Sequence, residues 1–172
     1  MGSAVPSVLL IGYGNPGRLD DGLGPALIDA LEGRELPFVT LDSNYQLQVE
    51  DADAIARHDV VLFVDADVSG PEPFWFGRVE PRAQMSFSSH SISPEALLDM
   101  SNNLLNGTAQ GYVLGIRGYD FNEFGERLSP GARRNMDQAL AFVETALREQ
   151  EWDRYVSQFD RNNQPPIQRD GN

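Results

Sequence analysis

The chain has 172 residues, of which 26 are acidic and 13 are basic, and its formal net charge is −13. This charge argues against a nucleic-acid partner and against an anionic membrane surface, because both attract basic proteins. The absence of cysteine excludes disulfides, thiolate metal sites and a cysteine nucleophile.

Short apolar runs alternate with amphipathic stretches along the chain. In chain order, the sequence predicts a strand at Ser7–Gly12, a helix from Asp21 to Gly33, a strand at Phe38–Leu41, a helix at Leu47–Arg57, a strand at Val60–Asp65, an edge strand at Phe74–Glu80, a helix at Pro94–Leu105, a strand at Tyr112–Arg117 and a helix at Ser129–Arg148. Strands that alternate with helices favour an α/β fold. We therefore predict a single domain with a mostly parallel, twisted sheet of about five strands and helices on both faces.

The last part of the chain has a different composition. From about Asp160 it turns polar, and the last predicted helix ends at Arg148. We predict one folded domain over residues 1–150 and a polar C-terminal tail over residues 151–172, disordered in part.

A glycine-rich loop follows the first predicted strand. Gly12, Gly14 and Gly17 spell G-x-G-x-x-G, which is the spacing of a dinucleotide-binding loop. In such a loop the helix begins at the third glycine, so that its free amides meet the diphosphate. Here Asp20 and Asp21 stand where the helix begins, and carboxylates at that end of a helix repel a diphosphate. The loop therefore presents acids, one of which we expect to cap the helix.

Acidic residues follow three of the predicted strands. Asp21 comes after the first strand, Asp42 ends the second and Asp65 ends the third, with Asp67 on the same side as Asp65. Ligands of open α/β sheets collect at the carboxyl ends of the strands. His90 lies in a hydroxyl-rich loop that leads into a helix, and together with Asp21 and Asp65 it makes a set of oxygen and nitrogen donors suited to Ni(II), Mn(II) or Zn(II).

Three segments resemble one known family. GYGNPGRLDDGLG, VVLFVDAD and SSHSISPEALL, in this order and spacing, are similar to segments of the nickel-iron hydrogenase maturation endopeptidases. The similarity covers about residues 7 to 148. It implies a phosphorylase/hydrolase-like fold, which is a twisted sheet flanked by helices, and a hydrolase that clips the C-terminal extension from a hydrogenase large-subunit precursor after nickel insertion.

The resemblance also implies the site. By motif position the family's metal ligands match Asp21, Asp65 and His90, which we predict to be both catalytic and metal-binding in an aspartic-type endopeptidase. The family often has glutamate at the first of these positions, and Asp20 is the neighbour that offers an alternative carboxylate. Asn15 and Asp42 match family positions that we predict to bind substrate.

The family has no permanent metal, so the expected nickel is supplied by the substrate. We expect a cytoplasmic monomer that activates a hydrogenase through its large-subunit precursor, with no nucleic-acid or membrane partner. Two alternatives stay open: a non-catalytic nickel-sensing metallochaperone with the same ligands, and a peptidyl-tRNA hydrolase, whose opening motif GLGNPG resembles Gly12–Gly17. RLDDGLG lacks the histidine that the second family uses shortly after that motif, and serine catalysis beside His90 has no nucleophile-elbow motif.

Overall fold

The structure is a computed structural model that describes residues 4–84 and 92–162. Within these residues, five strands form one sheet in the order β2-β1-β3-β5-β4. The strands are Val8–Tyr13 (β1), Val39–Asn44 (β2), Val60–Asp67 (β3), Phe74–Val79 (β4) and Gln110–Arg117 (β5). Neighbours among β1, β2, β3 and β5 run parallel, and β4 lies antiparallel to β5 at one edge. The predicted edge strand is therefore confirmed.

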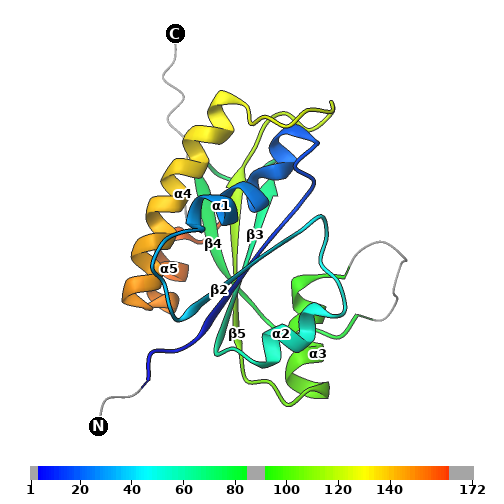
Figure 1. Cartoon of the computed structure of the whole chain (residues 1–172), viewed down its shortest axis with the longest axis vertical. Coiled ribbons are helices and arrows are strands. Elements are labelled where there is room, and N and C mark those ends of the chain that lie inside the picture. Colours follow the sequence, from blue (N-terminus) through cyan, green and yellow to red (C-terminus); the bar gives the residue numbers. More distant parts are fainter. Residues whose placement is uncertain (1–3, 85–91, 163–172) are drawn as a thin grey trace.

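Helices cover both faces of this sheet, as Figure 1 shows. The helical elements are a 3-10 turn at Leu19–Gly22 (η1), Leu23–Leu31 (α1), Asp51–Ala56 (α2), Pro94–Leu104 (α3), Pro130–Glu149 (α4) and Trp152–Phe159 (α5). α1, α4 and α5 pack on one face, and α2 and α3 pack on the other. The predicted α/β class, sheet and two helical layers are confirmed. No helix in residues 4–84 and 92–162 has both the length and the apolar composition needed to cross a bilayer.

The central strands are apolar on both sides because each side meets a helical layer. Leu10 and Leu62 face the layer of α1, α4 and α5, whereas Leu9 and Phe63 face α2 and α3, and all four are at most 1% exposed. Each such side chain stabilises the fold by about 1.5–3 kcal/mol relative to an exposed position. This burial explains why the strands read as continuous apolar runs.

Helix α1 approaches the sheet unusually closely at its first turn. A Cβ atom on Gly24 would lie 2.5 Å from the Val64 carbonyl oxygen and 2.7 Å from that of Tyr13. A Cβ atom on Gly12 would lie 2.4 Å from the Gly24 carbonyl oxygen. Only glycine fits at both contacts, and the contact brings the turn before α1 over the carboxyl ends of β1 and β3.

Sequence analysis predicts no element after residue 150, and this is wrong for Trp152–Phe159. These residues form α5, whose Trp152 and Tyr155 are buried in the core. The ring of Trp152 stacks on Phe76 and Tyr112, with centroids 6.2 and 5.7 Å apart. The segment is short and charged outside its aromatic positions, so its composition resembles a tail although one face is apolar. Residues 163–172 lie outside the described residues. Helix α2 is also shorter than the predicted Leu47–Arg57.

We expect Trp152→Ala to lower the free energy of unfolding by about 3–5 kcal/mol, because it removes a large ring from the core. Chemical denaturation followed by circular dichroism measures this change. Leu104→Ala is the control: Leu104 is 71% exposed, so its truncation should change the free energy by less than about 0.5 kcal/mol. Equal effects of the two variants would show that α5 does not contribute to the core.

Candidate functional site

Asp21 is held over the end of β1 by the glycine loop. The backbone N–H of Asn15 donates to Asp21 Oδ2 at 2.7 Å. Gly14 adopts a φ of 137° and lies so close to Asp21 that a Cβ atom would be 2.0 Å from the Asp21 carbonyl oxygen. A side chain at residue 14 would therefore push this acid away from the strand end. Asp21 itself is half-buried.

Asp20 has a different role from its neighbour. Its side chain is fully buried, and its Oδ2 accepts hydrogen bonds from Tyr119 N, Asp120 N and Ser129 Oγ. Its Oδ1 accepts a further bond from Ser129 N at 2.8 Å. Burial by itself would raise the pKa of Asp20, but these bonds hold it below the usual range. Asp20 thus ties the glycine loop to the loop after β5, and its oxygens are already occupied.

The expectation that one of these acids caps a helix is wrong. Neither η1 nor α1 has a side-chain cap in the structure. The donors that Asp20 satisfies belong to the loop over residues 119–129, about one hundred positions away in sequence. A local capping rule contains no information about such distant partners. Ser129, by contrast, accepts from Ala132 N and caps α4 as predicted.

Asp65 lies next to Tyr13 on the face of the sheet that α2 and α3 cover. Val64 pairs with Gly12 across the two strands, so the following residues, Asp65 and Tyr13, stand side by side. Asp65 Oδ1 accepts from Ala66 N at 2.8 Å, and the Tyr13 hydroxyl donates to the same carboxyl group. Sequence reasoning missed Tyr13, because only the strand register places it beside Asp65.

Burial, together with the negative charge of nearby Asp21, raises the pKa of Asp65 to about 7, although the hydrogen bonds from Ala66 N and Tyr13 oppose this shift. Burial together with Asp65 and Glu95 raises the pKa of Tyr13 well above its usual range, so that its hydroxyl stays protonated. The charge of Asp21 thus acts on Asp65, and a shared role of the two residues stays a prediction. Two carboxylates in a partly dry place repel each other, and a shared proton or a cation relieves that repulsion.

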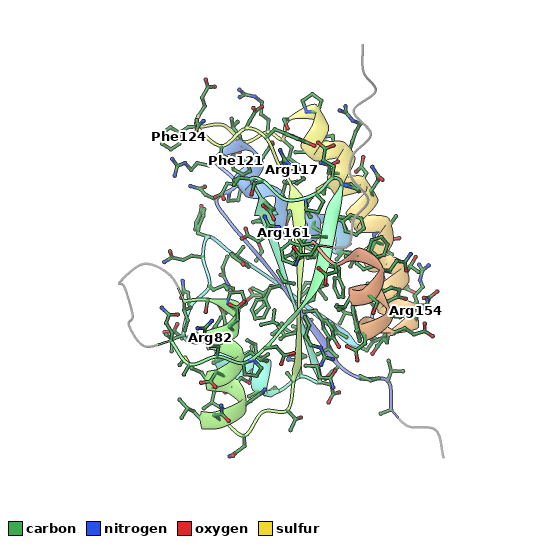
Figure 2. The ribbon with its side chains drawn as sticks, turned by 180° about the vertical axis from the view of Figure 1, so that it is seen from behind. Arg82, Arg117, Phe121, Phe124, Arg154 and Arg161 are labelled. Carbon is green, nitrogen blue, oxygen red and sulfur yellow. The ribbon has the colours of Figure 1, made fainter. Side chains whose placement is uncertain are left out.

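Asp67 faces the same side as Asp65, but its carboxylate is engaged. It accepts hydrogen bonds from Ser69 N, Gly70 N and Trp75 Nε1, at 3.0, 2.9 and 2.7 Å. Arg161, labelled in Figure 2, pairs at 3.6 Å with Asp67 Oδ2, the oxygen that also accepts from Trp75. Burial alone would raise the pKa of Asp67, whereas these contacts lower it. Asp67 therefore fixes the loop after β3 and is not free to bind a ligand.

His90 lies outside the described residues, as do Ser88, Ser89 and Ser91. Glu95 follows this loop in sequence and lies in the first turn of α3. Its charge acts on Tyr13. The start of α3 is thus near Tyr13 and Asp65. In residues 4–84 and 92–162, no three histidine, aspartate or glutamate side chains gather as a metal site. A third ligand for Asp21 and Asp65 stays a prediction.

The two predicted substrate-binding residues lie at the same edge of the sheet. The side chain of Asn15 accepts from Gly17 N at 2.9 Å and shapes the glycine loop. Asp42 pairs with Ile11 in the sheet, two positions before the row of Tyr13, and accepts from Ser43 N and Asn44 Nδ2. Both are partly exposed, and their role toward a substrate stays a prediction.

The fold is that of solved hydrogenase maturation proteases. The chain matches a hydrogenase 2 maturation peptidase from a Thaumarchaeota archaeon with a TM-score of 0.60 and 23% identity, over 82% of this chain and 97% of that one. It matches the hydrogenase maturating endopeptidase HybD from E. coli with a TM-score of 0.63 and 21% identity, over 84% and 94%. The corresponding values for the [NiFe] hydrogenase maturation protease HycI from Thermococcus kodakarensis are 0.64 and 21%, over 83% and 93%. The sequence matches no protein-family model and no curated protein sequence.

We expect Asp20→Asn to lower the free energy of unfolding by about 2–3 kcal/mol, because an amide nitrogen would face backbone donors in a buried place. Asp21→Asn is the matched comparison. It removes one acceptor at a half-buried position and should cost about 1 kcal/mol or less. Urea denaturation of the two variants measures the difference, and equal losses would show that Asp20 is no more structural than Asp21.

The metal-free protein should lose stability through Asp65 as the pH rises. The folded chain keeps a proton on Asp65 up to a pKa of about 7, whereas the unfolded chain releases it near the ordinary value of 3.8. The contribution of the protonated carboxyl group is therefore complete below about pH 4 and is lost above about pH 7. We expect the melting temperature of Asp65→Asn, relative to that of the original chain, to increase between these two values.

Asp67→Asn provides the opposite sign in the same measurement. The folded-state pKa of Asp67 lies below its ordinary value, so its ionised form stabilises the fold above that pH. The melting temperature of Asp67→Asn should fall further below that of the original chain as the pH rises. Thermal scans in the presence of a chelator test both variants. A pH-independent difference for Asp65→Asn would contradict the burial of its charge.

Proposed function

We propose that this protein is an endopeptidase that removes the C-terminal extension of a nickel-iron hydrogenase large-subunit precursor after nickel insertion. The substrate-bound nickel is the feature that it recognises. The proposal is supported by the shared fold, by the three motif segments and by the position of Asp21 and Asp65 at the carboxyl edge of the sheet. His90 is the proposed third ligand, and Asn15 and Asp42 are proposed to hold the substrate chain.

The electrostatic effect of Asp21 on the buried Asp65 carries this proposal. Without a cation, their repulsion and the burial of Asp65 favour one bound proton near neutral pH. A divalent ion held in the substrate replaces this proton and stabilises the ionised form of both carboxyl groups. Only a nickel-loaded precursor therefore completes the site. A nickel-free precursor brings no cation, so the repulsion between Asp21 and Asp65 persists when it binds. This difference in binding is the physical basis for cleaving loaded precursor alone.

Tyr13 supports this arrangement through its hydroxyl. Because its pKa lies well above the usual range, it donates to Asp65 throughout the physiological pH range. The Tyr13 hydroxyl and the Ala66 N–H together fix the orientation of the Asp65 carboxyl group. Tyr13 is in this proposal a positioning residue, since it acts through Asp65.

The test is the cleavage of purified precursor by purified protein, with the precursor either nickel-loaded or nickel-free. We expect a shortened product from the loaded form only, detected by mass spectrometry. Asp21→Asn, Asp65→Asn and His90→Ala should each lower the rate by at least about a hundredfold while their circular dichroism spectra stay unchanged. Leu104→Ala is the control, because its exposed side chain lies far along α3 from the site.

Each alternative has its own outcome in this assay. Equal rates for the two precursor forms would contradict the recognition of nickel. Binding of the loaded precursor with no shortening would favour the metallochaperone. Full activity of His90→Ala would remove His90 from the site. The cytoplasmic location and the monomeric state stay predictions.

A further inference from the structure

The loop that joins β5 to α4 is fastened to the glycine loop of the site. Gly125 N donates to the Gly17 carbonyl oxygen at 2.8 Å, and Leu19 N donates to the Gly125 carbonyl oxygen at 3.0 Å. The carboxylate of Asp20 binds the same loop at both of its ends. The two loops therefore form one rigid unit, and Asp21 lies only two positions after a residue that carries one of these bonds.

Phe124 stands out from this rigid unit. Its side chain is 83% exposed, although burying a phenylalanine stabilises a protein by about 1.5–3 kcal/mol. Phe121, three positions earlier, is half-buried and packs near Gly118. Figure 2 shows Phe124 farther from the sheet than Phe121, at the end of the molecule opposite to α3. The exposed ring is thus held at a fixed place by backbone bonds on both of its neighbouring segments.

Arg18 completes this feature. Its guanidinium lies over the Phe124 ring, 5.7 Å from the centroid. Within residues 4–84 and 92–162, no carboxylate forms an ion pair with Arg18. An exposed aromatic ring beside an arginine without an acidic partner is the combination that is enriched at the centres of protein interfaces.

Other exposed apolar side chains surround the same edge of the sheet. Tyr45 follows β2 and is 74% exposed, and Val68 follows β3 and is 63% exposed. They lie in loops at the carboxyl ends of strands β2 and β3, and the loop of Phe124 follows β5. The site between these strands is thus bordered by apolar groups from three loops. A short peptide bound in the site would not contact the apolar side chains of all three loops, whereas the surface of a folded protein is large enough to cover them together.

We propose that Phe124 and Arg18 anchor the folded protein substrate on the rim of the site. This inference rests on the proposed function for the identity of the partner. The partner surface offers an apolar recess for the ring and, beside it, a carboxylate or carbonyl oxygen that accepts from the guanidinium. Because the chain carries a net charge of −13, the surrounding partner surface is neutral or basic. The anchor positions the precursor before its C-terminal extension reaches Asp21 and Asp65.

Binding and cleavage are measured separately to test this anchor. The dissociation constant of the nickel-free precursor, which we expect the original chain to leave uncleaved, is measured by biolayer interferometry. We expect Phe124→Ser to raise this constant about tenfold or more, and Arg18→Gln to raise it to a smaller extent. In the active chain, Phe124→Ser should raise KM by a similar factor. Leu104→Ser, with a comparable exposed side chain on α3, is the matched control and should change neither value.

The outcomes separate this inference from the proposed function. Wild-type binding and KM in both Phe124→Ser and Arg18→Gln, with precursor still cleaved, would overturn the anchor and leave the endopeptidase intact. Binding that depends on Phe124, without any cleavage by the active chain, would support the anchor and overturn the endopeptidase. If the precursor is neither bound nor cleaved, both the anchor and the endopeptidase are overturned. A loss of melting temperature in Phe124→Ser is not expected for a side chain that is 83% exposed.

Discussion

The buried carboxylate of Asp20 is the contact on which the site depends. Its hydrogen bonds join two loops that follow different strands and that are about one hundred residues apart in sequence. Because this acid satisfies those backbone donors, the adjacent acid is left free to face Asp65. The two consecutive aspartates thus have different surroundings, since Asp20 is buried among hydrogen-bond donors and Asp21 is half-buried. A single acid at this turn could not both join the two loops and play the role that we propose for Asp21.

The site itself works against the stability of the fold. Burial makes the charge of Asp65 costly, and the negative charge of Asp21 adds to this cost. Nothing in the packing of the sheet requires an acid at the end of β3, where the preceding residues of the strand are fully apolar. Residues that cost stability in the free protein and gain a favourable partner on binding are typical of functional positions. The same reasoning applies to the exposed ring of Phe124.

Sequence patterns predict the elements here well and the contacts between elements poorly. The strand predicted at Val60–Asp65 is evident because Val60–Val64 is a continuous apolar run, and the cap at Ser129 follows from a local rule. Tyr13 could not be found in this way, because its place beside Asp65 depends on the register between β1 and β3. The separate roles of Asp20 and Asp21 also depend on distant donors. Helix α5 was missed because two aromatic residues in a polar segment give a weak periodic signal.

Helix α5 determines which part of the sheet becomes exposed when the fold is destabilised. It covers the aromatic face of β4, which includes Phe74 and Phe76 and lies at the edge of the sheet. β4 precedes this helix by more than seventy residues in sequence. The contact between β4 and α5 is therefore long-range, and such contacts form slowly during folding. A change that loosens α5 would expose a strand rich in aromatic residues with one unpaired side. Such variants are prone to aggregate, and they would be lost from solution while their acidic pair is still intact.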